Sequence, residues 1–162
     1  MGLAPRTPLY LIRGALPDQA LPTVPQNVQR HPVRAEAVAE FDRTLMGYER
    51  PQDHAFWAHD RTGALFTDEV GTVLGYGYAH PSGRIGPVAA ADPAYLPAFV
   101  GYLVRLTDVL EGRQLVVPGP AASILGPLLQ AGLRIDGTPA VHMADHPGPA
   151  FDRYIPMSYA LL

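Results

Sequence analysis

The chain has 162 residues, of which 48% are hydrophobic and 17% charged, and its net charge of −3 comes without a cluster of basic residues. This composition is typical of one globular domain; it excludes a disordered chain and offers no basic surface for nucleic acid or an anionic membrane. Cysteine and lysine are both absent, which excludes disulfide bonds, cysteine-ligated zinc and a lysine Schiff base.

The first third of the chain combines a strand, a Pro-rich stretch and two helices. Residues 8–13 are predicted as a short strand, whereas residues 14–32 show no regular period and are predicted as a linker. A short helix is predicted over 51–60, with Pro51 in its first turn. Before it, an amphipathic helix is predicted over 33–48, with an apolar face made by Val38, Phe41, Leu45 and Met46.

The middle of the chain predicts three strands followed by a helix. Two strands within residues 63–80, separated by Glu-Val-Gly, form a predicted hairpin. A third strand is predicted over 84–90. The following helix is opened by Pro93 or Pro97, and we expect it to continue to about residue 111.

The last third of the chain alternates strands and helices. A buried strand is predicted over 114–118, a helix within 119–132, and two closing strands within 133–143 and 153–162. From residue 33 the order of elements is α, α, β, β, β, α, β, α, β, β. This order predicts an α/β fold with a central mixed β-sheet and helices on both faces.

A short repeat links the two ends of the chain. Residues 2–12 resemble residues 132–143, with Gly-Leu and Thr-Pro recurring at offsets of 130 and 131. Either the match is a coincidence, or the chain opens with the tail of a preceding copy of the same domain. On the second interpretation, residues 1–14 are an appended strand, 15–30 a linker and 31–162 the domain.

Three stretches, taken with the order of elements, resemble the GCN5-related N-acetyltransferase (GNAT) family. Residues 41–57 are similar to its N-terminal helical pair, residues 71–104 to its central strands and cofactor helix, and residues 116–143 to its last helix and the following strand. The similarity is to degenerate bacterial members that often form the second half of tandem two-domain acetyltransferases. It implies a GNAT-like central mixed sheet with helices on both faces.

The resemblance implies acetyl-CoA as a cosubstrate. In active members, backbone N–H groups of a glycine-rich strand-to-helix turn and the helix N-terminus hold the acyl-CoA pyrophosphate. Here Leu96 replaces the polar opener of that motif, Phe99 replaces its first glycine, and Pro97 has no N–H to donate. The implied cofactor-binding residues are Val88, Ala89 and Ala90 on the strand, and Leu96, Ala98, Phe99, Val100 and Gly101 on the turn and helix.

The resemblance also identifies candidate catalytic groups. A backbone N–H near residues 88–90 would polarise the thioester carbonyl. Leu128 occupies the place of the family's tyrosine general acid, and the strand that carries the family's glutamate base has no carboxylate here. His80, just past the end of that strand, is the nearest titratable candidate for a general base.

Aromatic residues provide a candidate acceptor pocket. The second short helix carries two of them, either as pocket lining or as the aromatic anchor of an amphipathic helix. On the strand within 72–80, Gly75 and Gly77 occupy the face opposite two tyrosines, which fits either a bound ligand or a closely packed helix. The predicted pocket residues are His54, Trp57, Tyr76 and Tyr78.

Two functions remain open on the sequence, and the family resemblance favours the first. The first is a cytoplasmic acyltransferase that moves an acetyl group from acetyl-CoA to a small-molecule or peptide amine, without a metal. The second is a non-catalytic GNAT-like module that binds a partner GNAT domain or a second copy of itself. The repeated strand within residues 1–14 favours the second function, since an unpaired strand seeks a sheet edge. Neither function involves nucleic acid or a membrane.

Overall fold

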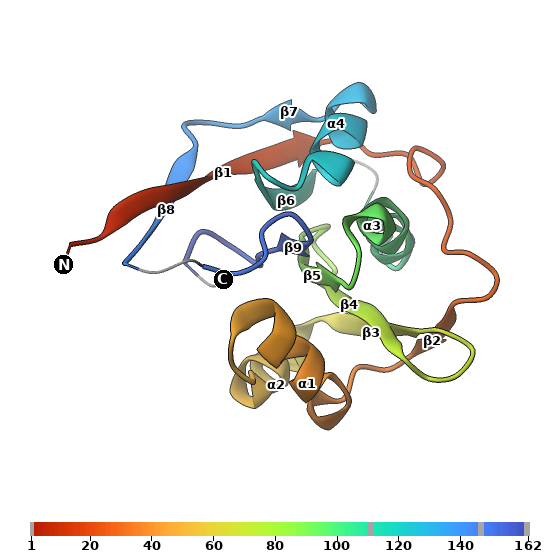
Figure 1. Cartoon of the computed structure of the whole chain (residues 1–162). Coiled ribbons are helices and arrows are strands. Elements are labelled where there is room, and N and C mark those ends of the chain that lie inside the picture. The colour runs from red at the N-terminus through yellow and green to blue at the C-terminus, as the bar shows by residue number, and fades with distance from the viewer. Residues whose placement is uncertain (1, 110–111, 146–147, 161–162) are drawn as a thin grey trace.

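The computed structural model describes residues 2–109, 112–145 and 148–160, and it has the mixed sheet with helices on both faces that the order of elements predicts (Figure 1). The helices are α1 (Ala35–Met46), α2 (Pro51–Asp60), α3 (Leu96–Arg105) and α4 (Ala122–Gln130), with a 3-10 turn η1 (Pro93–Tyr95) before α3. The strands are β1 (Ala4–Gly14), β2 (Gln29–His31), β3 (Thr62–Thr67), β4 (Val73–Ala79), β5 (Ile85–Ala90), β6 (Arg113–Pro118), β7 (Arg134–Ile135), β8 (Ala140–Ala144) and β9 (Tyr154–Ile155).

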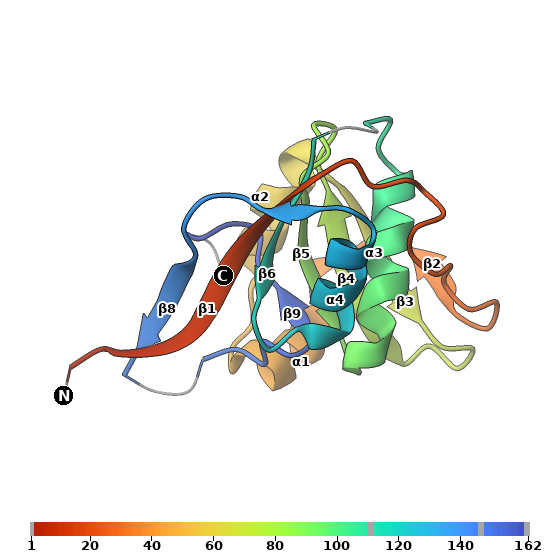
Figure 2. The same cartoon turned by 90° about the horizontal axis from the view of Figure 1, so that it is seen from above.

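The sheet consists of two antiparallel halves. One half has the order β2-β3-β4-β5-β9, and in the other half β1 has β6 on one side and β7 and β8 on the other. The halves meet where β5 and β6, which run parallel, are bridged at Arg84 and Gln114, with the Gln114 N–H donating to the Gly83 carbonyl at 3.1 Å. Beyond that bridge, β9 lies in the gap between β5 and β6 (Figure 2). We call this space the β5–β6 gap.

Each face of the sheet has its own hydrophobic core. Helices α3 and α4 cover one face together with residues 16–28, and α1 and α2 cover the other. Side chains alternate along β5 as expected for a strand buried on both sides: Val88 and Ala90 face α3, and Ala89 faces α1 and α2. Within the described residues, no helix has the length and apolarity required to cross a membrane.

The N-terminal strand is longer than the predicted 8–13 and is paired along both of its edges within its own chain. It pairs with β6 from Leu9 to Gly14, and with β7 and β8 on the other side. The two segments that resemble each other therefore lie side by side and antiparallel, with Ile12 opposite Ile135. This strand is an integral part of the sheet; that it derives from a preceding copy remains a prediction.

The stretch predicted as a linker over residues 15–30 packs onto the body of the domain. The Arg105 guanidinium of α3 donates from Nη2 to the carbonyls of Asp18 and Leu21, at 2.6 and 2.9 Å. The last residues of the stretch form β2, which pairs with β3. Its apolar side chains, Leu16, Leu21, Val24 and Val28, are buried against the α3 face.

Three further differences from the prediction concern the ends of elements. Helix α3 ends at Arg105, where the Thr107 hydroxyl donates to the Val104 carbonyl; the predicted end at residue 111 lies outside the described residues. The strand predicted within 133–143 divides into β7 and β8 because Gly137, with φ of +74°, turns the chain. Of the strand predicted within 153–162, β9 keeps Tyr154–Ile155, and residues 161–162 lie outside the described residues.

Candidate functional site

The exposed edge that a GNAT-like β5 would offer to an acyl-CoA is paired with the chain's own C-terminal segment. Val88 lies opposite Ile155, and Ala89 lies opposite Tyr154. Both residues of β9 are fully buried: Ile155 joins the core under α3, and Tyr154 joins the core under α1 and α2. The segment thus contributes to both cores and fills the β5–β6 gap.

The backbone groups at the end of β5 are occupied as well. The Ala90 N–H donates to the Arg153 carbonyl at 3.0 Å, and the Arg153 side chain donates from Nη1 to the Ala91 carbonyl at 2.9 Å. The Ala91 N–H donates to the Leu74 carbonyl at 2.8 Å. The Ala90 N–H lies in the segment that was expected to polarise a thioester, and it already has a partner.

The turn from β5 into α3 satisfies its own donors. The Ala94 N–H donates to the Asp92 carboxylate at 2.8 Å, and the Tyr95 N–H donates to the Asp92 carbonyl at 3.1 Å. Pro97 follows in the first turn of α3 and has no N–H. A negative side chain at this position opposes the binding of a second anion, so the turn is a poor cradle for a pyrophosphate.

Phe99 fills the space that glycine would leave open in an active member. Its ring stacks on Phe66, with 3.9 Å between ring centroids and 3° between ring planes, and on Tyr95, with 5.4 Å between centroids. Its side chain is fully buried. The stack occupies the clearance that close approach of a phosphate would require.

Gly101, the only residue that fits the family pattern, serves the packing of the chain on itself. A Cβ at this position would lie 2.8 Å from the Pro22 carbonyl oxygen, so glycine here makes room for the 15–30 stretch. The predicted cofactor residues are thus adjacent in space and buried in the core, and their binding of acetyl-CoA remains a prediction. The other three α3 members of the set, Leu96, Ala98 and Val100, are buried in the same core.

The glycine face of β4 is explained by helix packing. A Cβ on Gly75 would lie 2.2 Å from the Ala89 carbonyl oxygen of β5 and 2.7 Å from Phe99 Cε2, and a Cβ on Gly77 would lie 2.5 Å from Leu103 Cδ1. Phe99 and Leu103 belong to α3. Of the two interpretations that the sequence left open, close packing of a helix accounts for these glycines.

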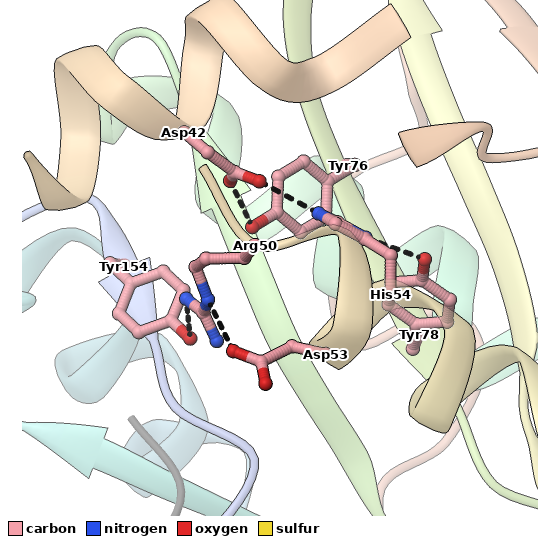
Figure 3. Close-up of polar contacts among 7 residues, drawn as sticks. All are labelled: Asp42, Arg50, Asp53, His54, Tyr76, Tyr78 and Tyr154. Atoms are coloured by element: carbon pink, nitrogen blue, oxygen red, sulfur yellow. Dashed lines mark hydrogen bonds and ion pairs between the residues drawn. The ribbon is translucent and has the colours of Figure 1, made fainter. Parts of the chain in front are cut away.

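The four predicted pocket residues do come together. His54, Tyr76 and Tyr78 lie around the carboxylate of Asp42 (Figure 3), and the Trp57 ring packs on His54 with 5.2 Å between ring centroids. Asp42 on α1 accepts hydrogen bonds from the Tyr76 hydroxyl at 2.7 Å and from His54 Nε2 at 2.8 Å. The Tyr78 hydroxyl lies 2.8 Å from His54 Nδ1. His54 can donate from Nε2 to Asp42 and accept from the Tyr78 hydroxyl at Nδ1, so every one of these polar atoms has a partner.

A buried arginine completes this polar network. Arg50, between α1 and α2, donates from Nη1 to the Tyr154 hydroxyl at 2.8 Å and from Nε to the Asp53 carboxylate at 3.0 Å. Its guanidinium carbon lies 4.6 Å from the centroid of the Trp57 ring, which is cation–π geometry. Tyr154 of β9 is thereby tied to the α2 side of the domain.

The electrostatics of the network are those of a closed interior. Burial is the main cause that raises the pKa of Tyr76 well above its ordinary value, with contributions from Tyr154 and Asp42. Burial likewise raises the pKa values of Tyr78 and Tyr154. Buried phenols whose hydroxyls have hydrogen-bond partners stabilise a fold. The network is therefore a structural anchor, and a role for these residues in binding an acceptor remains a prediction.

His80, the predicted general base, lies away from the rest of the predicted site. It follows Ala79, which pairs with Ile85 at the start of β5, whereas Ala90 is at the end of that strand. At a rise of about 3.3 Å per residue, the two ends of β5 are roughly 17 Å apart. His80 Nδ1 lies 2.7 Å from the Ser82 hydroxyl, and Nε2 lies 3.4 Å from the Asp60 carboxylate.

A small cavity of about 150 Å³ remains beside the end of β5. Ala90, Ala91 and Arg153 line it together with Phe41 and Leu45 of α1. It is too small for a coenzyme, and its lining is mainly apolar. Only part of the region expected to bind acyl-CoA is therefore open.

Four residues that shape this region were not singled out from the sequence: Asp42, Arg50, Arg153 and Tyr154. Asp42 gave a usable signal, because it lies four residues after Val38 and three before Leu45, on the apolar face of α1. Tyr154 gave no such signal. Its partners are distant in sequence, and local periodicity carries no information about them.

Solved structures resemble this fold, although sequence comparison finds no counterpart. No protein-family model matches the sequence, and no curated protein matches it. A candidate acetyltransferase from Pyrococcus horikoshii is 16% identical, with a TM-score of 0.68 over 98% of this chain and 53% of that one. A GCN5-related N-acetyltransferase from Sphaerobacter thermophilus is 16% identical, with a TM-score of 0.56 over 94% of this chain and 56% of its own.

These similarities show that the chain has the GNAT fold, as its order of elements predicts. The chain spans little more than half the length of each of the two structures. In each of those two chains, the part outside the match is somewhat smaller than the matched part.

Proposed function

We propose that this chain is a GNAT-fold domain that does not bind acetyl-CoA in the β5–β6 gap and that serves as a protein-association module. One observation carries the proposal: the Arg153 carbonyl accepts the Ala90 N–H, and β9 fills the β5–β6 gap. The resemblance to GNAT enzymes implies that acetyl-CoA would bind along this edge of β5.

Displacement of the C-terminal segment would be costly, which supports the proposal. Tyr154 and Ile155 are fully buried, and the Tyr154 hydroxyl accepts a hydrogen bond from a buried guanidinium. Burial of a large apolar side chain contributes about 1.5–3 kcal/mol, and a hydrogen bond to a charged group about 1.5–3 kcal/mol. Acetyl-CoA would have to offset these contributions before it gained any contact of its own.

The test is a calorimetric titration of acetyl-CoA into the intact chain, followed by a thermal-unfolding series with the same ligand. We expect no saturable heat and no rise in Tm up to millimolar acetyl-CoA. A micromolar Kd for acetyl-CoA, together with a Tm that rises with acetyl-CoA concentration, would contradict the proposal that the gap is closed to this ligand. Free CoA is the matched ligand control, since it carries the same pyrophosphate without the thioester.

Acetyl-CoA-dependent acetylation of an amine is the second candidate function. The observation that favours it is the cavity of about 150 Å³ beside Ala90 and Ala91, at the end of the strand where the resemblance places the thioester. A titration with a micromolar Kd would support this candidate, and a screen of small-molecule and peptide amines would follow.

A further inference from the structure

We infer that β8 is an association edge, and that a second copy of this chain pairs with it antiparallel around a two-fold axis at His142. The inference deepens the association role proposed above and rests on that part of the proposal alone. It does not depend on whether the β5–β6 gap is closed.

The first observation concerns the segment made by residues 4–8 of β1 and by β8, which we call the arm. Pairing between β1 and β6 begins only at Leu9, so the arm is a two-stranded ribbon that projects from the body (Figures 1 and 2). A ribbon of two strands is marginally stable in water unless further strands or a packed face support it.

The second observation is that the arm exposes apolar side chains. Val141 is 52% exposed, Met143 is 49% exposed, and Leu3, just before the arm, is 66% exposed. Val141 and Met143 alternate with His142, which turns inward onto the Phe151 ring at 5.1 Å. A cavity of about 620 Å³ lies between the arm and the end of α1, so the domain does not pack closely beneath it.

The third observation is that the two edges of the arm differ in their capacity to pair. The Pro8 carbonyl accepts the Gly119 N–H at 2.9 Å, so the backbone of Pro8 points away from β8. The β1 edge of the arm, on the side away from β8, therefore has no N–H donor at Pro8. Pro8 lies opposite Val141. That pair is therefore a non-hydrogen-bonded pair, and the Val141 N–H and C=O point outward, away from β1.

By strand alternation the Met143 N–H and C=O also point outward. Ala140–Ala144 contains no proline and no Asp, Glu, Lys or Arg, the residues that usually protect an edge strand. The Ala144 carbonyl accepts from Arg6 Nε of β1 at 3.3 Å. At Val141 and Met143, no backbone–backbone hydrogen bond outside strand pairing involves the described residues. Among those residues, the outer edge of β8 is thus open.

The sequence of β8 matches itself in the antiparallel direction. With His142 on the two-fold axis, Val141 of one copy lies opposite Met143 of the other, and both apolar side chains lie on the exposed face. A second copy therefore completes both the backbone pairing and the apolar face. The two structures of similar fold are each nearly twice this length, which agrees with a neighbour of similar size.

The test is sedimentation equilibrium of the intact chain without acetyl-CoA, from about 1 to about 100 μM protomer. We expect a monomer–dimer equilibrium in the unmodified chain and at least a tenfold weaker dimer in Val141→Lys. The matched control is Val70→Lys, at an almost fully exposed residue between β3 and β4, which should dimerise as the unmodified chain does.

An unmodified chain that stays monomeric at every concentration would overturn the inference, as would a Val141→Lys chain that dimerises normally. If Val141→Lys fails to fold, amide hydrogen exchange in the unmodified chain decides. Exchange at Val141 and Met143 should slow as the concentration rises, and exchange that is independent of concentration contradicts the proposed edge. If acetyl-CoA does bind in the β5–β6 gap, only the acetyl-CoA titration would reveal it. An error in that proposal is therefore distinguishable from an error in the proposed pairing at β8.

Discussion

The buried carboxylate of Asp42 organises the polar contacts beneath α1 and α2. Asp42 is fully buried and accepts from Tyr76 and His54, and Arg50, also buried there, pairs with Asp53 and Tyr154. A buried charge is tolerated only when its polar atoms have partners. The aromatic cluster predicted as a pocket is the shell that supplies those partners.

The tyrosines of this cluster predict a specific response to alkaline pH. The pKa values of Tyr76, Tyr78 and Tyr154 are raised in the folded state, so the folded protein holds protons that unfolded tyrosines lose near pH 10. Their contribution is complete below about pH 10, and the free energy of unfolding falls as the pH rises above it.

Urea unfolding measured across this range, together with phenolate absorbance, checks the response. Tyr76, Tyr78 and Tyr154 should ionise only as the protein unfolds. Ionisation of these three tyrosines near pH 10 in a protein that remains folded would show that the network is open to water.

Gly75 gives a second residue-scale prediction. In Gly75→Ala, the new Cβ would lie 2.2 Å from the Ala89 carbonyl oxygen and 2.7 Å from Phe99, and neither neighbour is free to move away. We expect a loss of about 1–3 kcal/mol in the free energy of unfolding. Gly126→Ala is the control: it lies within α4 with no atom near the added Cβ, and it should be neutral or stabilising by up to about 1 kcal/mol. Equal stability of the two variants would contradict the close packing of β5 and α3 around Gly75.

At the scale of elements, periodicity and turn residues predicted most of the helices and strands. Helix α2 begins and ends where predicted, and the hairpin of β3 and β4 differs by about a residue at each end. The exceptions are segments whose structure depends on distant partners. Residues 15–30 have no regular period of their own, and Arg105 holds them by hydrogen bonds to their backbone. The C-terminal segment pairs with β5 only at Tyr154 and Ile155, and the buried side chains of these two residues fix it there.

Strand β1 gives the prediction at this scale. A chain without residues 1–14 loses the buried side chains of Leu9 and Ile12 and the strand that joins β6 to β8. We expect it to show no cooperative unfolding transition, and we expect a synthetic peptide of residues 1–14 to restore one. The control is deletion of residues 1–3, which precede the strand and should leave the transition in place.

A folded monomer after deletion of residues 1–14 would mean that β1 contributes little to its own domain. That outcome would favour the interpretation in which this strand belongs to a neighbouring copy. Circular dichroism and a thermal melt of the two deletion variants distinguish these cases.

At the scale of the whole molecule, the sequence predicted the mixed sheet and the GNAT resemblance, and the structural similarities confirm the GNAT fold. The candidate site was less predictable. The residues expected around acetyl-CoA were predicted from their place in the chain, and they do lie together at the β5–α3 turn. That β9 would fill the gap beside them could not be predicted, since neither Arg153 nor Tyr154 carries a local pattern.

The most direct measurement is NMR hydrogen exchange at the Ala90 amide, with and without acetyl-CoA. A buried N–H that donates to the Arg153 carbonyl should exchange slowly, with protection close to that of global unfolding, and neither its rate nor its chemical shift should change when acetyl-CoA is added. Rapid exchange at Ala90, or a saturable shift of this amide with acetyl-CoA, would contradict the closed gap.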